Sequence, residues 1–439
     1  MREKAIETVI ERIDRYQEEI IKFLQEYVRI KSTNFDFVEN PQEGVPTEEE
    51  TCQKWIYDNL QKWKIFEKID FWEGAKGRPS LAAVLKGAGG KGQSLMFNGH
   101  TDTVSVSEEQ KSKWEGSPWS GEFRDGKVWG RGAVDMKGGN IAFLMAAKML
   151  SETGIKLNND LILTLTIGEE SGQHWLGCDT ILQRGYKAPF AIIAEPTNMA
   201  LWPTLKGEIY FKITVSGKAT HICNRNQMVQ PLPYGKERPG VSAIDKMLKI
   251  QQEIMNLENQ WALYREHPLN PQGGMFININ TIKGGESWSS QPAVCEVTGS
   301  TLFNPDLSSD EVISEIKAAV DRVTQGDYWL KEHPPTLEIP WYIQLKEPVN
   351  VSPNHPGCKA LAGAHKRIKG VDPTITCGTS TTDANYWFPQ GQDSVIYGPG
   401  DITMGCHGAN EYLPVDQLIE ASKIMAIMMI DWCEIHSFK

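Results

Sequence analysis

Two short stretches decide the fold of this chain, and they read Leu95-Met-Phe-Asn-Gly-His100-Thr-Asp102-Thr and Gly130-Arg-Gly-Ala-Val-Asp135-Met-Lys-Gly-Gly139. In the first, an apolar run that begins at Ser94 stops at Asn98-Gly99, and a histidine and a carboxylate follow. Polar side chains at the end of a buried strand are a common place for chemistry in an open α/β sheet. In the second, glycines surround Asp135 and let the backbone approach a neighbour closely, which is typical of a ligand in a tight turn.

Length and charge limit the possible functions. The chain has 439 residues, more than a single hydrophobic core usually supports, so we expect two domains. A hydrophobic fraction of 40% predicts a fully folded globular protein. The net charge of −11 argues against nucleic acid as a partner, because binding to phosphates needs a basic surface.

The sequence predicts neither export nor membrane insertion. Residues 1–7 begin a charged amphipathic pattern in place of an apolar signal segment. The longest uncharged apolar run, Ile424–Ile430, is too short to span a bilayer, which takes roughly 20 residues. We therefore expect a cytoplasmic protein with no membrane partner, in which the eight scattered cysteines are reduced.

Short apolar runs alternate with helical patterns along most of the chain. A long amphipathic helix is predicted for Arg2–Ile30, and Ile141–Leu150 and Val415–Ile435 also have helical patterns. The strand candidates are Leu81–Leu85, Ser94–Phe97, Leu161–Ile167, Phe190–Ala194 and Ser394–Tyr397. This alternation predicts an α/β fold with a sheet flanked by helices.

The pattern changes between about Lys206 and Tyr342. The order there is strand, helix, strand, strand, helix and strand, which is that of a split βαβ unit and predicts a two-layer α+β domain of ferredoxin-like type. The pattern of the sheet domain resumes after Pro348. We therefore expect a catalytic domain in two parts, residues 1–205 and 343–439, with residues 206–342 inserted between them.

Further imidazole and carboxylate groups lie at or just beyond the ends of predicted strands. They are Glu169 and Glu170 after Leu161–Ile167, Glu195 after Phe190–Ala194, and His407 after Ser394–Tyr397. With His100 and Asp135, these nitrogen and oxygen donors could together hold metal ions. Cys406 is an alternative donor to His407, and we favour the imidazole.

Five motifs in the same order as in relatives carry a resemblance to a known family. They are Gly99-His100-Thr-Asp102-Thr-Val, Trp129-Gly-Arg-Gly-Ala-Val-Asp135-Met-Lys-Gly-Gly, Glu169-Glu170-Ser-Gly, Ala194-Glu195-Pro, and Gly398-Pro-Gly with His407-x-x-Asn410-Glu411. On these motifs the chain resembles the dinuclear-zinc metallopeptidase family that includes acetylornithine deacetylase, succinyl-diaminopimelate desuccinylase, aminoacylases and glutamate carboxypeptidase. The likeness covers essentially the whole chain.

The resemblance implies a centre of two Zn²⁺ ions, for which Co²⁺ or Mn²⁺ are plausible substitutes. Asp135 would bridge the two ions. His100 and Glu195 would complete one site, and Glu170 and His407 would complete the other. Two ions roughly 3.5–4 Å apart would activate a water molecule and polarise the carbonyl of a substrate.

The resemblance also implies roles for residues that do not bind metal directly. Glu169 would be the general base, which takes the proton of the water and delivers it to the leaving amine. Asp102 would orient His100 through the second ring nitrogen of the imidazole. The peptide bond between Asp135 and Met136 is expected to be cis, as in relatives.

The inserted domain carries a further candidate catalytic residue. His221, in the stretch Val215-Ser-Gly-Lys-Ala-Thr-His221, matches a histidine of the relatives' inserted domain. The resemblance implies that this lid and dimerisation domain places the histidine in the active site of the partner subunit, where it stabilises the oxyanion. A homodimer would follow. The residues after His221 depart from the usual small ones.

Substrate binding is the part of the family pattern that this chain follows least. Gly378, Thr379 and Ser380 lie in a loop that resembles a glycine-rich substrate-binding loop of relatives, and they are candidates to bind a polar group. Leu302 ends a strand on which relatives usually carry an arginine that holds the substrate carboxylate, and Ser289 replaces a usual asparagine.

Two explanations fit the missing arginine. Arg225 or Arg238 could take its place, or the substrate carries no carboxylate there. We predict an enzyme that removes an acyl group from an N-acyl amino acid or a related small-molecule amine. The alternatives are a dipeptidase or carboxypeptidase, against which the absent arginine weighs, and a catalytically silent metal-binding protein, which the presence of Glu169 disfavours. His174 and the other remaining histidines are expected to have no catalytic role.

Overall fold

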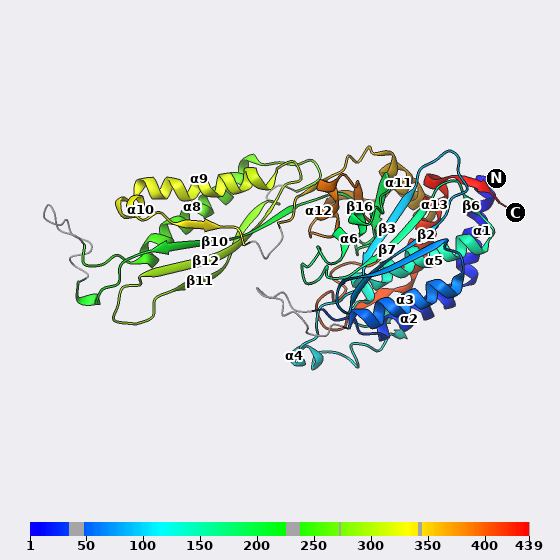
Figure 1. The fold of residues 1–439 in the computed structure, drawn as a ribbon, viewed down its shortest axis with the longest axis horizontal. Helices are drawn as coiled ribbons and strands as arrows, with labels where there is room; N and C mark the ends of the chain where they lie inside the picture. Colours follow the sequence, from blue (N-terminus) through cyan, green and yellow to red (C-terminus); the bar gives the residue numbers. More distant parts are fainter. Residues whose placement is uncertain (35–47, 225–237, 272–273, 341–344, 439) are drawn as a thin grey trace. The chain divides into compact units, whose positions relative to one another are not determined.

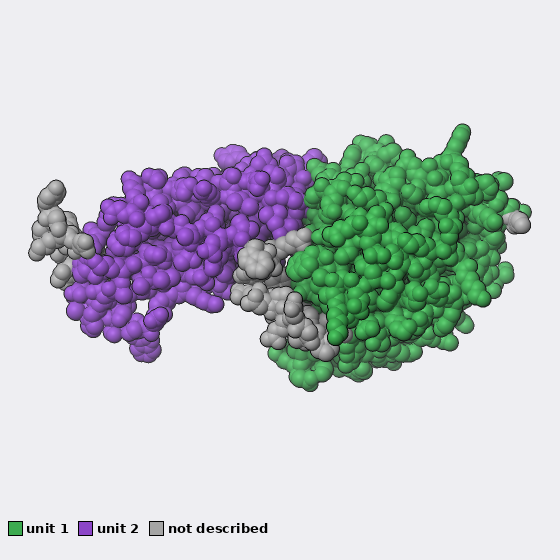
Figure 2. Space-filling model, viewed as in Figure 1, with its two compact units in different colours: residues 1–204, 349–439 green, residues 205–348 purple. Residues whose placement is uncertain are grey.

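The computed structural model describes residues 1–34, 48–224, 238–271, 274–340 and 345–438. It divides into two compact units, which comprise residues 1–204 with 349–439 and residues 205–348 (Figure 2). The first unit is discontinuous in sequence, and the second is inserted between its two parts. Compared with the predicted inserted domain of residues 206–342, the second unit begins one residue earlier and ends six residues later.

A nine-stranded mixed sheet forms the centre of the first unit (Figure 1). Its strands run in the order β1 (Lys68–Ala75), β2 (Arg78–Leu85), β7 (Leu161–Thr166), β3 (Leu95–His100), β8 (Phe190–Ile193), β16 (Ser394–Ile396), β9 (Leu201–Leu205) and β14 (Val349–Asn350), with β15 (Ile375–Gly378) also paired to β9. Strands β7, β3, β8 and β16 are mutually parallel. Their carboxyl ends therefore lie at the same edge of the sheet, where the predicted site residues follow them.

Helices flank this sheet. They are α1 (Arg2–Arg15), α2 (Gln17–Arg29), α3 (Glu49–Trp63), α4 (Glu108–Lys111), α5 (Gly138–Glu152), α6 (Cys178–Gln183), α11 (Pro356–Lys369), α12 (Ala384–Trp387) and α13 (Val415–Cys433). Helix α5 packs against β3 and β7 and also against α13, so residues 138–150 are buried on every side. This position explains why its sequence is apolar all round. Within the part of the chain that the structure describes, no helix is long and apolar enough to cross a membrane.

The predicted single helix Arg2–Ile30 is wrong, because two helices occupy this segment. Tyr16 separates them with dihedrals of φ −111° and ψ 24°, outside the helical region. Its amide donates to the carbonyls of Arg12 and Ile13, which ends α1, and the Arg12 guanidinium lies 4.5 Å from the centre of the Tyr16 ring. No glycine or proline marks the break, and apolar residues recur at helical spacing on both sides of it.

Short strands connect distant parts of the first unit. A three-stranded antiparallel sheet contains β4 (Glu122–Arg124), β5 (Lys127–Trp129) and β17 (Tyr412–Pro414), and a second pair contains β6 (Lys156–Leu157) and β18 (Ile435–Ser437). Trp129 at the end of β5 pairs with Tyr412 at the start of β17. This register brings the segment that continues to Asp135 beside the segment that comes from His407.

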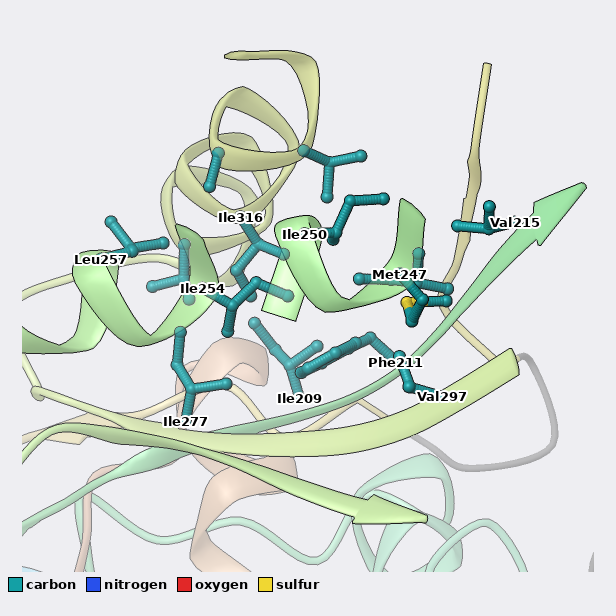
Figure 3. Packing of buried hydrophobic residues seen from close by; sticks show 14 of the residues in the cluster. Ile209, Phe211, Val215, Met247, Ile250, Ile254, Leu257, Ile277, Val297 and Ile316 are labelled. Atoms are coloured by element: carbon teal, nitrogen blue, oxygen red, sulfur yellow. The ribbon is translucent and has the colours of Figure 1, made fainter. Parts of the chain in front are cut away.

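The second unit has the predicted order of elements. It contains β10 (Gly207–Ser216), η2 (Ile222–Asn224), α8 (Ala243–Tyr264), β11 (Phe276–Gly284), β12 (Val294–Phe303), α9 (Ser309–Gly326), α10 (Tyr328–Glu332) and β13 (Thr336–Glu338). The sheet is antiparallel in the order β11-β12-β10-β13, which is the ferredoxin-like arrangement. Alternate residues of β10, including Ile209 and Phe211, are buried against α8 residues such as Ile250 and Ile254 (Figure 3).

Candidate metal centre

Three of the parallel strands deliver titratable side chains to one edge of the large sheet. His100 is the last residue of β3, Glu169 and Glu170 follow β7, and Glu195 follows β8. The side chains of His100, Glu170 and Glu195 are 1%, 6% and 9% exposed. Strand β3 continues to His100 instead of ending at Phe97, so the backbone that carries the imidazole belongs to the sheet and not to a loop.

Asp135 lies in a tight turn, η1 (Ala133–Lys137), that precedes α5. The peptide bond between Asp135 and Met136 is cis, which confirms that prediction. Gly132 has φ 82°, a left-handed conformation that favours glycine. A Cβ on Gly139 would lie 1.9 Å from the carbonyl oxygen of Ala194, so this glycine allows the turn to approach the strand end that carries Glu195.

The two carboxylate oxygens of Asp135 face two different sets of donors. Oδ1 lies 3.1 Å from His100 Nε2, and Glu195 Oε1 lies 3.6 Å from the same nitrogen. Oδ2 lies 3.3 Å from His407 Nε2, which is in turn 3.0 Å from Glu170 Oε2. The two oxygens of the Asp135 carboxylate therefore face two separate sets of donors.

The other ring nitrogen of His100 is held by Asp102, but mainly through the backbone. Nδ1 lies 2.9 Å from the Asp102 carbonyl oxygen and 3.7 Å from its carboxylate Oδ1. With Nδ1–H donating to this carbonyl, Nε2 is the ring nitrogen that faces Asp135 and would bind a cation. The Asp102 carboxylate instead accepts hydrogen bonds from Asn34 Nδ2 at 2.9 Å and from the Glu170 amide at 3.1 Å, so it positions the segment that carries Glu170.

In the sequence, Glu411 is recognisable only as the last residue of a motif, and the structure shows its contacts. Glu411 Oε1 accepts hydrogen bonds from the backbone amides of Val134 and Asp135, at 3.0 and 3.2 Å. Its Oε2 lies 2.5 Å from Nη1 of Arg131, and both side chains are buried. This ion pair fixes the turn that presents Asp135, and the family motif was its only signal in the sequence.

Electrostatics show that the cluster attracts positive charge. Burial, together with the charges of Asp135 and Glu169, raises the pKa of Glu195 well above its ordinary value. Hydrogen bonds with Asp135, Cys406 and Glu170 raise the pKa of the His407 imidazole. Several carboxylates thus lie close together, and the protonated imidazoles supply the positive charge that balances them. Divalent cations would displace these protons, and the nitrogen and oxygen donors fit Zn²⁺, Co²⁺ or Mn²⁺.

A cavity of about 360 Å³ opens beside these donors. It is lined by Asp135, Glu169, Glu170, Glu195, Pro196, Trp202, Ser380, Thr381, Thr382, Ile402, Cys406 and His407. Of the predicted substrate-binding loop, Ser380 lines the cavity, Gly378 is buried at the end of β15, and Thr379 is exposed. Trp202 is a wall residue that sequence reasoning did not identify.

Three residues singled out in the sequence, His221, Arg225 and Leu302, fall within the range of the second unit. His221 is exposed, forms a β-bridge with Ser290, and accepts a hydrogen bond at Nδ1 from the Cys223 amide at 3.2 Å. Arg225 lies outside the described residues. Leu302 pairs with Glu208 and Phe276 within the sheet.

His174 belongs to a second, fully buried cluster. Its Nδ1 lies 2.9 Å from Asp383 Oδ1 and 3.9 Å from Cys178 Sγ. The other oxygen of Asp383 accepts hydrogen bonds from Asn98 and Thr166, so this carboxylate connects β3, β7 and the segment after Glu170. No cavity residue belongs to this trio, which is consistent with a structural role for His174.

Comparison with known proteins gives the family. The sequence pattern of Peptidase family M20/M25/M40 matches residues 96–431. An N-formyl-4-amino-5-aminomethyl-2-methylpyrimidine deformylase of Bacillus subtilis (strain 168) is 33% identical over 394 residues, which cover 88% of this chain and 89% of the relative. A probable succinyl-diaminopimelate desuccinylase of Staphylococcus epidermidis (strain ATCC 12228 / FDA PCI 1200) is 24% identical over 425 residues, covering 92% and 95%.

The fold is also that of solved members of this family. The crystal structure of human carnosine dipeptidase 1 superposes with a TM-score of 0.68 at 16% identity, and the match covers 98% of this chain and 99% of the dipeptidase. The relatives are named for cleaving amide bonds, and the donors around Asp135 fit divalent cations. This chain therefore belongs to Peptidase family M20/M25/M40 and is a metal-dependent hydrolase of amide bonds.

Proposed function

We propose that this chain removes the formyl group from an N-formyl derivative of a small amine that carries an aromatic ring, of the aminomethylpyrimidine type, at a centre of two Zn²⁺ ions. The observation that carries the chemistry is the division of donors around Asp135. His100 and Glu195 face one carboxylate oxygen, while Glu170 and His407 face the other. When bound, the two ions supply an activated water and polarise the substrate carbonyl.

Glu169 is the proposed general base. It follows β7 directly, precedes the donor Glu170, and lines the cavity. From that position its carboxylate takes the proton of the attacking water and passes it to the amine that leaves. The Asp102 carbonyl accepts the proton on Nδ1 of His100, which leaves Nε2 able to bind a metal ion. His100 therefore acts as a metal ligand and not as a second general acid.

The cavity wall supports a substrate without a carboxylate. Pro196, Trp202 and Ile402 offer apolar and aromatic surface, and Ser380, Thr381 and Thr382 offer hydroxyl groups. The described residues that line the cavity include no lysine or arginine, and Leu302 is at the position where an arginine was expected. The name of the Bacillus subtilis relative's substrate describes a formamide of an aminomethylpyrimidine, which likewise carries no carboxylate. A dipeptidase or carboxypeptidase would require a cationic clamp.

Measuring the amine and the acid that are released tests the substrate assignment. Protein loaded with Zn²⁺, Co²⁺ or Mn²⁺ is offered the N-formyl aminomethylpyrimidine, N-formyl and N-acetyl amino acids, an N-succinyl diamino acid and a dipeptide, with a chelated control. We expect chelator-sensitive release of formate from the pyrimidine formamide. Turnover of the panel compounds that carry a carboxylate should be much slower. Preferential cleavage of the succinyl compound would overturn the deformylase assignment, but the assignment as an amide hydrolase would still hold. Silence on the whole panel, with two metal ions bound, would indicate a silent metal-binding protein.

The second unit supports a homodimer in which His221 acts on the partner's active site. Strand β11 is at the edge of its sheet, where backbone groups can pair with another chain. Leu248 and Met255 lie seven residues apart on α8 and are 52% and 48% exposed, so these two apolar side chains lie on the same face of the helix. We propose that these surfaces associate and that His221 stabilises the oxyanion across the dimer.

Sedimentation equilibrium tests this assembly. The expected mass is twice the 49.3 kDa of one chain. A variant with Leu248→Lys and Met255→Lys is expected to dissociate and to lose kcat, because the monomer would lack the histidine of its partner. The same two changes at exposed Glu7 and Glu11 of α1 serve as a control. A wild-type chain that is monomeric and fully active would contradict the proposal.

A further inference from the structure

Cys406 lies inside the proposed metal centre and has no assigned role. Its Sγ is 2.8 Å from Asp135 Oδ2, the oxygen that also faces His407. The thiol lines the same cavity as His407 and Glu170. The donor atoms of Asp135, Cys406 and His407 lie within 4.8 Å of one another, which is close enough to hold one ion.

The backbone around Cys406 is arranged to direct both it and its neighbour to Asp135. Gly405 has φ 82° and His407 has φ 57°, so left-handed residues flank the cysteine on both sides. The turn is anchored from outside, because Arg131 Nη2 donates to the Gly408 carbonyl at 2.9 Å and Gln110 Nε2 donates to the His407 carbonyl at 3.1 Å. The thiol is therefore held at the metal side of the loop by several independent contacts.

We propose that Cys406 is a fourth donor to the ion held by Asp135, Glu170 and His407, which makes the two metal sites chemically unequal. This inference rests on the proposed dinuclear centre. With the thiolate, the site around Asp135 Oδ2 would have four donors from the protein: Asp135, Cys406 and His407, whose donor atoms lie within 4.8 Å of one another, and Glu170, whose Oε2 lies 3.0 Å from His407 Nε2. The site around Asp135 Oδ1 has three, from Asp135, His100 and Glu195.

This inequality has a chemical consequence. Four-coordinate zinc sites with sulfur and nitrogen donors are typically closed, whereas a site with three protein donors keeps a position open for water or substrate. Thiolate is a soft donor that selects zinc over harder ions such as Mn²⁺. The Cys406 side therefore retains zinc, and the His100 side exchanges metal and presents the open position to substrate.

The spectrum of the cobalt-loaded protein tests the sulfur–metal bond without reference to activity. Wild-type chain carrying two Co²⁺ ions is expected to show a near-ultraviolet sulfur-to-cobalt charge-transfer band, and Cys406→Ser is expected to lose that band while keeping visible cobalt bands. Cys223→Ser is the matched control, because Cys223 is exposed and the six other cysteines are buried. It should keep the band.

Two outcomes separate this inference from the proposed function. Wild-type protein with two bound Co²⁺ ions and no charge-transfer band would overturn the role of Cys406 and leave the dinuclear centre standing. Protein that binds fewer than two ions, measured by elemental analysis, would contradict the centre itself.

Competition between metals gives a second readout. Even outer-shell partners of a metal site typically contribute 10–100-fold in affinity, so loss of a direct donor should weaken zinc binding at one site by at least about 10-fold. With Zn²⁺ and Mn²⁺ in equal amounts, the wild-type chain is expected to retain one zinc ion after dialysis, and Cys406→Ser is expected to show a weaker preference for zinc over manganese. An unchanged preference in the serine variant would contradict the proposal.

Discussion

Replacing Glu169 by glutamine is expected to lower kcat by roughly 10²–10⁴-fold, the usual contribution of a positioned general base. The amide keeps the size of the side chain but cannot take a proton from water. Glu169 lines the cavity, and its neighbour Glu170 is the residue that faces His407, so metal content should not change. The measurement is steady-state kinetics on the substrate identified by formate release, together with elemental analysis of bound metal.

Glu170→Gln is the matched control, one residue away. It changes a proposed ligand, and it should lower metal content as well as turnover, whereas Glu169→Gln should lower turnover alone. Equal metal loss in both variants would show that Glu169 is a ligand, and undiminished turnover in Glu169→Gln would show that another group is the base.

Replacing Asp135 by asparagine is expected to weaken both metal ions at once. Its two carboxylate oxygens face separate donor sets, with His100 Nε2 at 3.1 Å from one oxygen and His407 Nε2 at 3.3 Å from the other. The amide keeps the shape but offers one oxygen and no negative charge, so it cannot serve two cations. Elemental analysis after dialysis should show loss of both ions, and chelated wild-type protein should match the variant in lacking turnover.

Asp125→Asn controls for the chemical change itself. Asp125 is exposed in the turn between β4 and β5 and has φ 53°, a conformation that asparagine tolerates well. This variant should bind both metal ions and retain activity. If Asp135→Asn instead kept one ion at wild-type affinity, Asp135 would belong to a single site and the bridging role would be wrong.

Much of the fold could be predicted because its elements follow strong local rules. Alternating apolar and helical patterns predicted the flanked sheet, and the order of elements predicted the ferredoxin-like unit. The exact ends of the strands and helices were harder to predict from the sequence. Strand β3 continues past Phe97 through a polar residue because Asn98 is satisfied internally, donating to Asp383 and accepting from Thr164. Such partners lie far away in sequence, so periodicity cannot identify them.

The candidate site divides in the same way. The motifs around His100, Asp135 and His407 indicated metal donors, because the sequence alone shows imidazoles and carboxylates next to glycines. Contacts made by the backbone have no such signature, and the acceptor nearest to His100 Nδ1 is a carbonyl oxygen of Asp102. The roles of Glu411 and Cys406 also depend on which oxygen of which carboxylate they meet, and only coordinates supply that information.

The pairing of β5 with β17 also determines when the candidate metal centre can be completed during synthesis of the chain. Cys406 follows Asp135 by 271 residues, and the whole second unit is translated between them. At about 5–20 residues per second, a ribosome needs roughly 15–55 s to cover that distance. A nascent chain thus carries His100, Asp135, Glu170 and Glu195 before the segment with Cys406, His407 and β17 has been made. Chains that stop before this segment lack Cys406 and His407 and are therefore expected to be inactive.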